Sequence, residues 1–434
     1  MTVETTAMNQ LEVFDSPLPD RRTGWLAVGM GDCDKAGFLY RDPDLNDIKL
    51  VKLRYQDVTN VGSPSAQPAP ELVVDGLTPS AHNASLFYGA SCMAIAMQPG
   101  NDAYTEFRRS EAGIWSGKTI KVVESGMVTG LTGRGGWQEA DGTMVVIATA
   151  NVDGTVKGIV GRLPIKAYSE WEFSSFPLPA GYTELLALRQ APDGTAHALY
   201  TKTLDPCDGS CDLDLYYGRM ASAGTWIEET VQTSKWGEPD DEFATDPTMV
   251  LDSRGEPVVA ATYFKRVITG SIKSAELRLY GRDNGEWCQE TMATEVDGYQ
   301  GSDGTAMTGI APFVAVDNTG RVHVVFQDMA QWHAKDPMDQ INKANAINGQ
   351  VRYAVRSGKT WTLATLFEQD DEGTDAAQAP LNGMLPTQVA VSGDGATVYA
   401  AGASFEWDTN TIYNTSAKPM TFKAVTVKAA VQLP

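Results

Sequence analysis

A unit of four short apolar runs repeats along this chain and constrains its fold more than any other feature. In the clearest copy, the first run ends at a turn over residues 317–320, and later runs begin at Val322, Val351 and Trp361. Apolar and polar residues alternate within each run, and glycine-containing turns separate the runs, which is the pattern of antiparallel strands. Each unit therefore predicts one four-stranded antiparallel sheet.

Two markers recur with similar spacing and count these units. Because a sheet that is apolar on both faces must pack against further sheets, a repeat of about 60 residues with four strands predicts propeller blades. The first marker is a glycine between the first and second strands, at Gly142, Gly194, Gly255, Gly320 and Gly395. The second is a tryptophan that opens the fourth strand, at Trp115, Trp171, Trp226, Trp287 and Trp361.

We predict an all-β fold, a seven-bladed β-propeller of four-stranded antiparallel blades that forms a single domain over residues 1–434. The blades are expected at about residues 10–58, 84–124, 127–177, 183–232, 246–294, 310–367 and 386–434. The alternative is six blades with an N-terminal extension before residue 85.

Four details of this architecture follow from local sequence. Residues 25–30 are expected to be a second strand, and the Pro-rich segment 61–79 a long loop between blades. Residues 11–15 have no preceding blade and are expected to close the last sheet. A helix is expected only within the insert at 336–347.

Several copies of the repeat resemble the Asp-box (BNR-type) repeats of sialidase-like β-propellers. In that family, a Ser-x-Asp-x-Gly-x-x-Trp box forms the turn between the third and fourth strands. The most similar segment here is Arg282-Asp283-Asn284-Gly285-Glu286-Trp287, and the resemblance covers about residues 85–366. It implies a propeller fold, whereas the Arg-Ile-Pro motif of sialidases is absent from the sequence.

In a propeller, the loops that follow second and fourth strands lie on one face. These loops are long in this sequence, and long loops on a rigid scaffold are where binding and catalysis concentrate. They carry aromatic residues beside carboxylates, which suits a glycan site because sugar rings stack on aromatic faces while acids accept hydroxyl hydrogen bonds. The candidate catalytic residues are Asp246, Asp328, His333 and Glu406, and the candidate ligand-binding residues are His82, Tyr182, Trp236, Arg266, Tyr299, Trp332 and Trp407.

The leading hypothesis is a propeller that binds a glycan on this face, either as a binding protein alone or as a glycosidase that also cleaves the glycan. One alternative is a polysaccharide lyase, which needs His or Tyr beside a cation such as Lys265 or Arg266. The other is a non-catalytic propeller that docks a protein partner, since a rigid disc with adaptable loops serves that purpose equally well.

The formal net charge is −21, from 34 Lys and Arg against 55 Asp and Glu. Such a charge repels nucleic acid and anionic membranes, so the expected partner is a carbohydrate or a protein, and we expect a monomer. The sequence has no apolar run long enough to span a membrane. We expect a secreted or periplasmic protein whose leader has been removed, or otherwise a cytoplasmic one.

Five cysteines cannot all pair. Cys207 and Cys211 lie four residues apart in an expected loop and are predicted to form a disulfide. Cys33, Cys92 and Cys288 are predicted to stay free, the last two as buried apolar residues. No cofactor is expected, although acids around the cysteine pair could bind calcium through oxygen ligands, namely Asp205, Asp208, Asp212 and Asp214.

Overall fold

The computed structural model describes residues 3–16, 26–30, 35–44, 47–57, 71–77, 84–89, 92–99, 103–122, 128–130, 136–139, 141–164, 170–203, 213–222, 224–235, 240–267, 272–293, 304–332, 347–358, 360–368, 381–391, 397–407 and 420–431. Within these residues the secondary structure is β-strand, without a helix element. Nothing in this part of the chain is therefore a helix that could cross a membrane. The predicted helix at 336–347 falls almost entirely outside the described residues.

The described strands form seven antiparallel sheets, which we give in chain order. The sheet nearest the N-terminus contains β2 (Leu26–Met30), β3 (Ala36–Asp44), β4 (Asp47–Asp57) and β5 (Glu71–Leu77). The next contains β6 (Ser85–Tyr88), β7 (Ala94–Pro99), β8 (Ala103–Arg109) and β9 (Trp115–Lys121). A five-stranded sheet follows, with β10 (Val128–Gly130), β11 (Gly136–Gln138), β12 (Met144–Val152), β13 (Thr155–Leu163) and β14 (Glu172–Pro177).

The remaining sheets have longer strands on average. One contains β15 (Glu184–Gln190), β16 (Ala196–Thr203), β17 (Leu213–Ser222) and β18 (Thr225–Gln232). The next contains β19 (Asp240–Leu251), β20 (Pro257–Val267), β21 (Ile272–Asp283) and β22 (Glu286–Ala293). The sheet after it contains β23 (Gly304–Val316), β24 (Val322–Trp332), β25 (Ile347–Ser357) and β26 (Thr360–Glu368). The last combines β27 (Leu381–Val391), β28 (Thr397–Trp407) and β29 (Met420–Val431) with β1 (Val3–Ser16).

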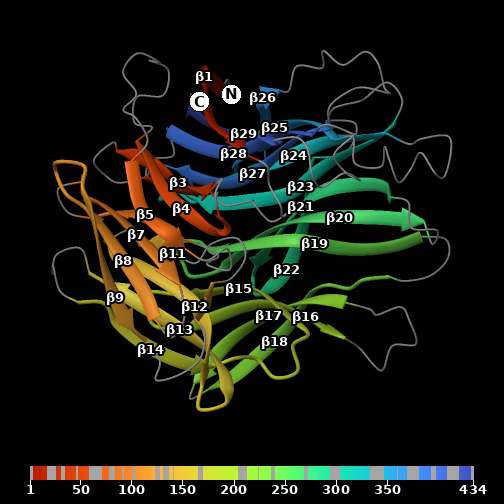
Figure 1. Ribbon diagram of the computed structural model, residues 1–434. Helices are drawn as coiled ribbons and strands as arrows, with labels where there is room; N and C mark the ends of the chain where they lie inside the picture. Colours follow the sequence, from red (N-terminus) through yellow and green to blue (C-terminus); the bar gives the residue numbers. More distant parts are fainter. Residues whose placement is uncertain are drawn as a thin grey trace.

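The sheets follow one another around a ring, and the chain colours run once around it in Figure 1. The first strands of neighbouring sheets contact one another, for example β15 with β19 and β19 with β23, so they lie toward the centre and we call them inner strands. Both chain ends lie close together, because the N-terminal β1 pairs antiparallel with the C-terminal β29 (Figure 1). The predicted all-β propeller class and the closure by residues 11–15 are confirmed, while the number of blades stays a prediction.

The first predicted blade, residues 10–58, is wrong in its strand assignment. Residues 25–30 were expected to be a second strand, but β2 is the inner strand of its sheet and pairs with β3. The outer strand of that sheet is β5, which lies within the segment that we expected to be a loop, and β1 belongs to the last sheet. The error has a simple cause. Because β1 pairs with β29 in the last sheet, each strand of the first sheet takes a position one place earlier than expected, so that β2 is the first strand and β3 the second.

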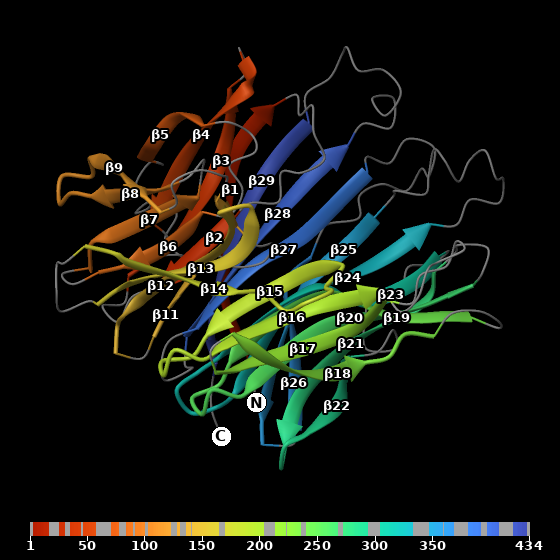
Figure 2. The same ribbon diagram turned by 90° about the horizontal axis from the view of Figure 1, so that it is seen from below.

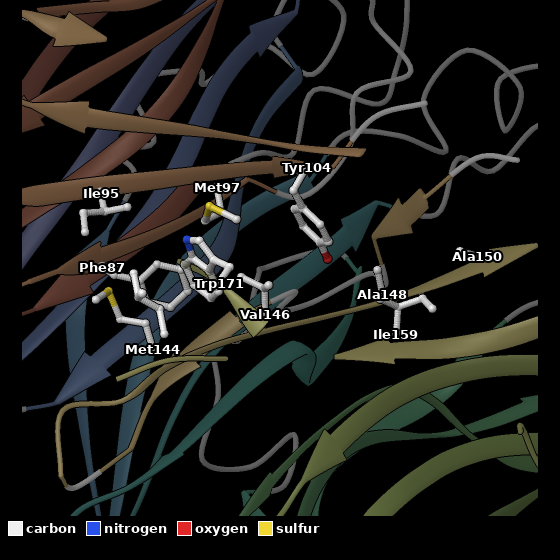
Figure 3. Packing of buried hydrophobic residues seen from close by; sticks show 11 residues of the cluster. Phe87, Ile95, Met97, Tyr104, Met144, Val146, Ala148, Ala150, Ile159 and Trp171 are labelled. Atoms are coloured by element: carbon white, nitrogen blue, oxygen red, sulfur yellow. The ribbon is translucent and has the colours of Figure 1, made fainter. Parts of the chain in front are cut away.

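Apolar side chains fill the space between consecutive sheets. Between the sheets of β6–β9 and β10–β14, for example, Phe87, Ile95 and Met97 from one sheet meet Val146 and Trp171 from the other (Figure 3). Similar clusters lie between the next three pairs of sheets in chain order. The sheets β10–β14, β15–β18 and β19–β22, which have such clusters on both sides, are thus buried on both faces, which is why their second strands have nearly continuous apolar sequence.

The recurring tryptophan has an inter-sheet role that its sequence position did not reveal. In three copies, a Trp indole and an Arg guanidinium both donate to one Glu carboxylate on the outer strand of the preceding sheet, with Trp Nε1 to Glu Oε2 distances of 2.9, 2.8 and 3.1 Å. These charge-assisted bonds join neighbouring sheets at the rim. The three sets are Glu71 with Arg109 and Trp115, Glu229 with Arg282 and Trp287, and Glu290 with Arg356 and Trp361.

Two cysteine predictions are corrected by the structure. Cys92 is part of a disulfide bond rather than a free thiol, and it lies in the turn before β7. Cys288 is free as predicted but exposed on β22 rather than buried. Strand patterns cannot reveal which cysteines meet in space, and so they missed the Cys92 bond. Cys33, Cys207 and Cys211 lie outside the described residues, and the predicted Cys207–Cys211 disulfide stays a prediction.

Candidate functional site

The two ends of the sheets differ in their connections, as Figure 2 helps to follow. One end carries the tight turns between first and second strands, where Gly142, Gly194, Gly255 and Gly320 adopt φ between 79° and 88° as their turn role requires. We call this the short-loop end, and the opposite end, where second strands finish, the long-loop end. The sequence assigns the candidate residues to the long-loop end.

Of the eleven candidates, four lie outside the described residues and four are described by their backbone alone. His82, Trp236, Tyr299 and His333 lie outside the described residues. Four others are described by their backbone alone, at or near the long-loop ends of their strands: Arg266 on β20, Trp332 on β24, and Glu406 and Trp407 on β28. Their predicted roles stay predictions.

Asp328 is completely buried and cannot reach a ligand in this structure. Its carboxylate accepts hydrogen bonds from the Thr308 hydroxyl and from Arg352 Nη1, the latter at 3.0 Å. Burial raises the pKa of Asp328, while these two partners oppose the rise. A buried aspartate with its own arginine is a structural ion pair, because removing either partner would leave an uncompensated charge inside the protein.

Two other candidates take part in packing or in local hydrogen bonds. Tyr182 is half-buried and packs onto the cluster around Leu188 and Tyr200 between two sheets. Asp214, the described member of the proposed calcium set, is buried on β17 and accepts the Ser234 backbone N–H at 2.8 Å. The described residues contain no group of three or more acidic, His or Cys side chains suited to a metal ion. Calcium binding by the remaining acids of the set stays a prediction.

The Glu242 carboxylate is paired with one tyrosine hydroxyl and two lysine side chains. The Tyr263 hydroxyl donates to Glu242 Oε2 at 2.7 Å, and Lys235 and Lys265 lie 3.3 and 3.8 Å from the same carboxylate. The tyrosine hydrogen bond lowers the pKa of Glu242 most, and the lysines lower it further. Because Tyr263 is buried and Lys265 is engaged, this cluster does not supply the accessible Tyr and free cation that a lyase would use.

Asp246 has a different environment, because its side chain is exposed on the inner strand β19. The register of β19 with β20 shifts between Thr245 and Thr248, so Asp246 and Pro247 form a bulge, and Asp246 has φ of 48°. A bulge re-aims a side chain relative to its strand. The inner strand β23 has a matching bulge, in which Ala311 also has φ of 48° and precedes a proline. The bulged backbone is therefore common to both inner strands, whereas the carboxylate is present only in the bulge of β19.

The Asp246 carboxyl has a raised pKa. Although its side chain is open to solvent, the surrounding protein removes enough water to favour the neutral form, and the negative charge of Glu184 raises the pKa further. Glu184 is also exposed and begins the neighbouring inner strand β15. The sequence did not single out Glu184, because its proximity to Asp246 depends on two inner strands that meet only in the ring.

Comparison with known proteins gives similarity of structure at low identity. No protein-family model matches the chain, and no curated protein matches it. A polysaccharide lyase described as an ulvan lyase is 9% identical with a TM-score of 0.49, over 95% of each chain. The polysaccharide lyase Uly1 is 8% identical with a TM-score of 0.48, over 92% of this chain and 89% of that one. An α-L-arabinanase from Penicillium chrysogenum is 10% identical with a TM-score of 0.36, over 81% of this chain and 94% of the enzyme.

Proposed function

We propose that this protein binds a glycan at the long-loop end of the ring and cleaves it with Asp246 as the general acid. The observation that supports the proposal is the Asp246 carboxyl itself, which is exposed, has a raised pKa and lies near a second exposed carboxylate, Glu184. A general acid must reach its substrate and hold a proton near the working pH. Perturbed carboxyls at accessible places are the usual mark of such a role.

The chemistry needs two carboxyl groups in different protonation states. Asp246 would donate its proton to the glycosidic oxygen as the bond to the anomeric carbon breaks. Glu184 would accept a proton from the water that adds to that carbon. One water molecule is consumed, and each product ends with a free hydroxyl. The aromatic residues predicted at this end, such as Trp332 and Trp407, would offer faces for the sugar rings.

The proposal is tested by hydrolysis and binding assays on a polysaccharide panel with wild type, Asp246→Asn and Asp246→Ala. Loss of a general acid typically lowers the rate by roughly 100- to 10,000-fold. We expect a loss of this size in both variants, with binding retained. Because Ala311 occupies the matching bulge, Asp246→Ala is expected to fold. Wild-type activity should fall as the pH rises through the raised Asp246 pKa, since only the protonated form can donate.

A matched control is Glu286→Gln, which removes an exposed carboxylate on β22 at the short-loop end and should leave activity unchanged. Full activity in Asp246→Asn would contradict the acid role. A cleavage product with a new carbon–carbon double bond would indicate elimination instead of hydrolysis. Absence of binding to every glycan in the panel would overturn the proposed function and favour a protein partner.

A further inference from the structure

Cys92 occupies the position that a glycine has in other turns of the short-loop end. Its backbone N–H donates to the Gly89 carbonyl at 3.1 Å, and the Gly89 N–H donates to the Met93 carbonyl at 2.9 Å. The same two hydrogen bonds form the turns of Gly142, Gly194, Gly255 and Gly320. Cys92 has φ of 60°, where a residue with a Cβ is disfavoured relative to glycine. Its side chain must therefore make an interaction that offsets this backbone strain.

The disulfide bond of Cys92 is that interaction, and its partner can be identified from the chain. Because Cys288 is free, the partner is Cys33, Cys207 or Cys211. These three lie outside the described residues, but described strand ends on either side limit how far each can reach. A chain spans at most about 3.6 Å per residue, and the two Cα atoms of a disulfide lie within about 7 Å of each other.

Cys207 and Cys211 are too far from Cys92. They lie between β16 and β17, whose ends at Thr203 and Leu213 pair at the long-loop end. With 8 residues, β16 runs about 23 Å from there to the short-loop end. Cys207 lies within about 14 Å of Thr203 and Cys211 within about 7 Å of Leu213, so neither can bridge this distance. The sheet β10–β14 also packs between their sheet and the sheet that contains Cys92.

The connection that contains Cys33 belongs to the same end of the neighbouring sheet. It joins β2 to β3 as the Cys92 turn joins β6 to β7, since both link a first strand to a second strand. The strand β6 contacts both β2 and β3. At the start of β3, a Cβ added to Gly37 would lie 2.5 Å from the hydroxyl oxygen of Tyr88, at the end of β6. Gly37 is four residues from Cys33, and Tyr88 is four residues from Cys92, so these two cysteines can meet.

We infer that Cys33 and Cys92 form a disulfide bond that joins the sheets β2–β5 and β6–β9 at the short-loop end. Two thiols lose two protons and two electrons to a small disulfide such as glutathione disulfide, which is converted to two thiols. Cys33 is then not free as expected, and Cys207 and Cys211 remain to pair with each other as predicted. The proposed glycan site belongs to the opposite end of the sheets, so this inference does not depend on the proposed function.

Such a bond bears on where the protein works. Structural disulfides form and persist in oxidising compartments and are rare where thiols are kept reduced. A Cys33–Cys92 bond therefore favours the expected secreted or periplasmic location over the cytoplasmic one.

Peptide mapping tests the pairing directly, on the alkylated monomer band from a denaturing gel without reductant. Trypsin places the candidate partners in separate peptides, with Cys33 in residues 23–35, Cys92 in 55–108, Cys207 and Cys211 in 203–219, and Cys288 in 283–321. We expect peptides 23–35 and 55–108 to be joined and to separate on reduction. An alkylated peptide 23–35, or a bond between 55–108 and 203–219, would overturn the inference.

Two variants separate the bond from the backbone strain. Cys33→Ala removes the bond and leaves a cysteine at φ of 60°, whereas Cys92→Gly removes the bond and restores the glycine of the other turns. Cys33→Ala should lower the thermal midpoint by about 2–4 °C, as expected for loss of one disulfide from a chain of this length. Cys92→Gly should lower it by less, because glycine fits the turn. Reductant should lower the midpoint of the wild type more than that of either variant.

Cys288→Ala is the matched control, because it removes a cysteine whose thiol is free and exposed. Its thermal midpoint and its response to reductant should match those of the wild type. If reductant lowered the midpoint of Cys33→Ala as much as that of the wild type, Cys33 would not hold the bond, and the inference would fail.

Discussion

The boundary between β15–β18 and β19–β22 and the next boundary, between β19–β22 and β23–β26, share one backbone design but differ in polar pairing. At the second boundary, the Thr262 hydroxyl is paired with Gly309 and the bulge carries Ala311. At the first, the Thr201 hydroxyl is unpaired and the bulge carries Asp246. The repeat supplies geometry at every boundary, and a boundary becomes a candidate site where the repeat leaves polar groups unsatisfied.

The sheets β15–β18 and β23–β26 each contain a buried histidine, and these two histidines also differ in how many of their polar atoms are paired. His323 Nδ1 and Nε2 lie 2.5 Å from the Tyr353 hydroxyl and 3.2 Å from Asp317 Oδ2, so both ring nitrogens have partners. His197 has the equivalent tyrosine, Tyr217, at 2.7 Å from Nδ1, but its Nε2 is unpaired. The sheet of β15–β18 thus leaves two polar groups unpaired that other sheets satisfy, and its long-loop end contributes to the candidate site.

The largest expected effect on stability comes from replacing Gly309, at the boundary between β19–β22 and β23–β26, with the alanine found at the equivalent position of the other boundary. The equivalent residue of β19 is Ala244, counted from the bulge proline. Gly309 has φ of 77°, and an added Cβ would lie 2.6 Å from the Leu277 Cα. Gly309→Ala should therefore lower the free energy of unfolding by about 3 kcal/mol or more, from backbone strain and from overpacking.

Chemical denaturation measures this loss, with Gly320→Ala as the control. Gly320 has φ of 81° but open space around the added Cβ. We expect the control to lose only about 1–2 kcal/mol, the strain component alone. Equal losses in the two variants would show that the close approach at Gly309 relaxes easily.

The contributions of the two histidines to the free energy of unfolding should differ at acid pH. Burial lowers the pKa of His197 to about 4, whereas for His323 the hydrogen bond to Asp317 opposes the lowering by burial. A histidine that is neutral in the folded state and has a pKa near 6.5 when unfolded destabilises the fold as the pH falls below 6.5. We expect His197 to account for roughly 2–3 kcal/mol of stability lost between pH 7 and pH 4.

The measurement is the free energy of unfolding against pH for the wild type, His197→Gln and His323→Gln. The wild type should lose stability through this window, and His197→Gln should lose less over the same interval. His323→Gln should reduce the pH dependence by a smaller amount. The contrast between the two sheets would fail if both substitutions changed the pH dependence equally.

The smallest effects concern the two threonines. Thr262→Val removes the donor to the Gly309 carbonyl and should lower the free energy of unfolding by about 1–2 kcal/mol. Thr201→Val removes a hydroxyl that has no partner, so its stability should stay within about 0.5 kcal/mol of the wild type or rise slightly. Thermal and chemical unfolding of both variants gives the comparison, and a destabilised Thr201→Val would reveal a partner for that hydroxyl in the free protein.

Much of the fold was predictable because the repeat carries local information. Turn glycines such as Gly194 and Gly320 mark positions that need positive φ, and short, nearly continuous apolar runs identify strands that are buried on both faces. Closure of the last sheet by residues 11–15 was also predicted, because no blade precedes them. The first sheet was nevertheless misassigned, because β2 was taken as a second strand and because β5 lies in a Pro-rich segment that local sequence marks as a loop.

The candidate site was less predictable than the fold. Asp246 was singled out from the sequence as a loop-end acid, and the structure places it on an inner strand, exposed and near another carboxylate. Asp328 was singled out on the same grounds and is buried against Arg352. Both aspartates were expected near a strand end, so sequence position could not separate an accessible acid from a structural ion pair.

The sequence by itself determined the class of fold, the turn positions and the end of the sheets that carries the long loops, because periodicity and turn chemistry act over a few residues. Only the tertiary structure decided that β5 completes the first sheet, that Trp and Arg join neighbouring sheets through one Glu, and that Glu184 and Thr201 face the sheet that carries Asp246. These features depend on which sheets pack side by side, and side-chain chemistry at such boundaries comes from residues far apart in the chain.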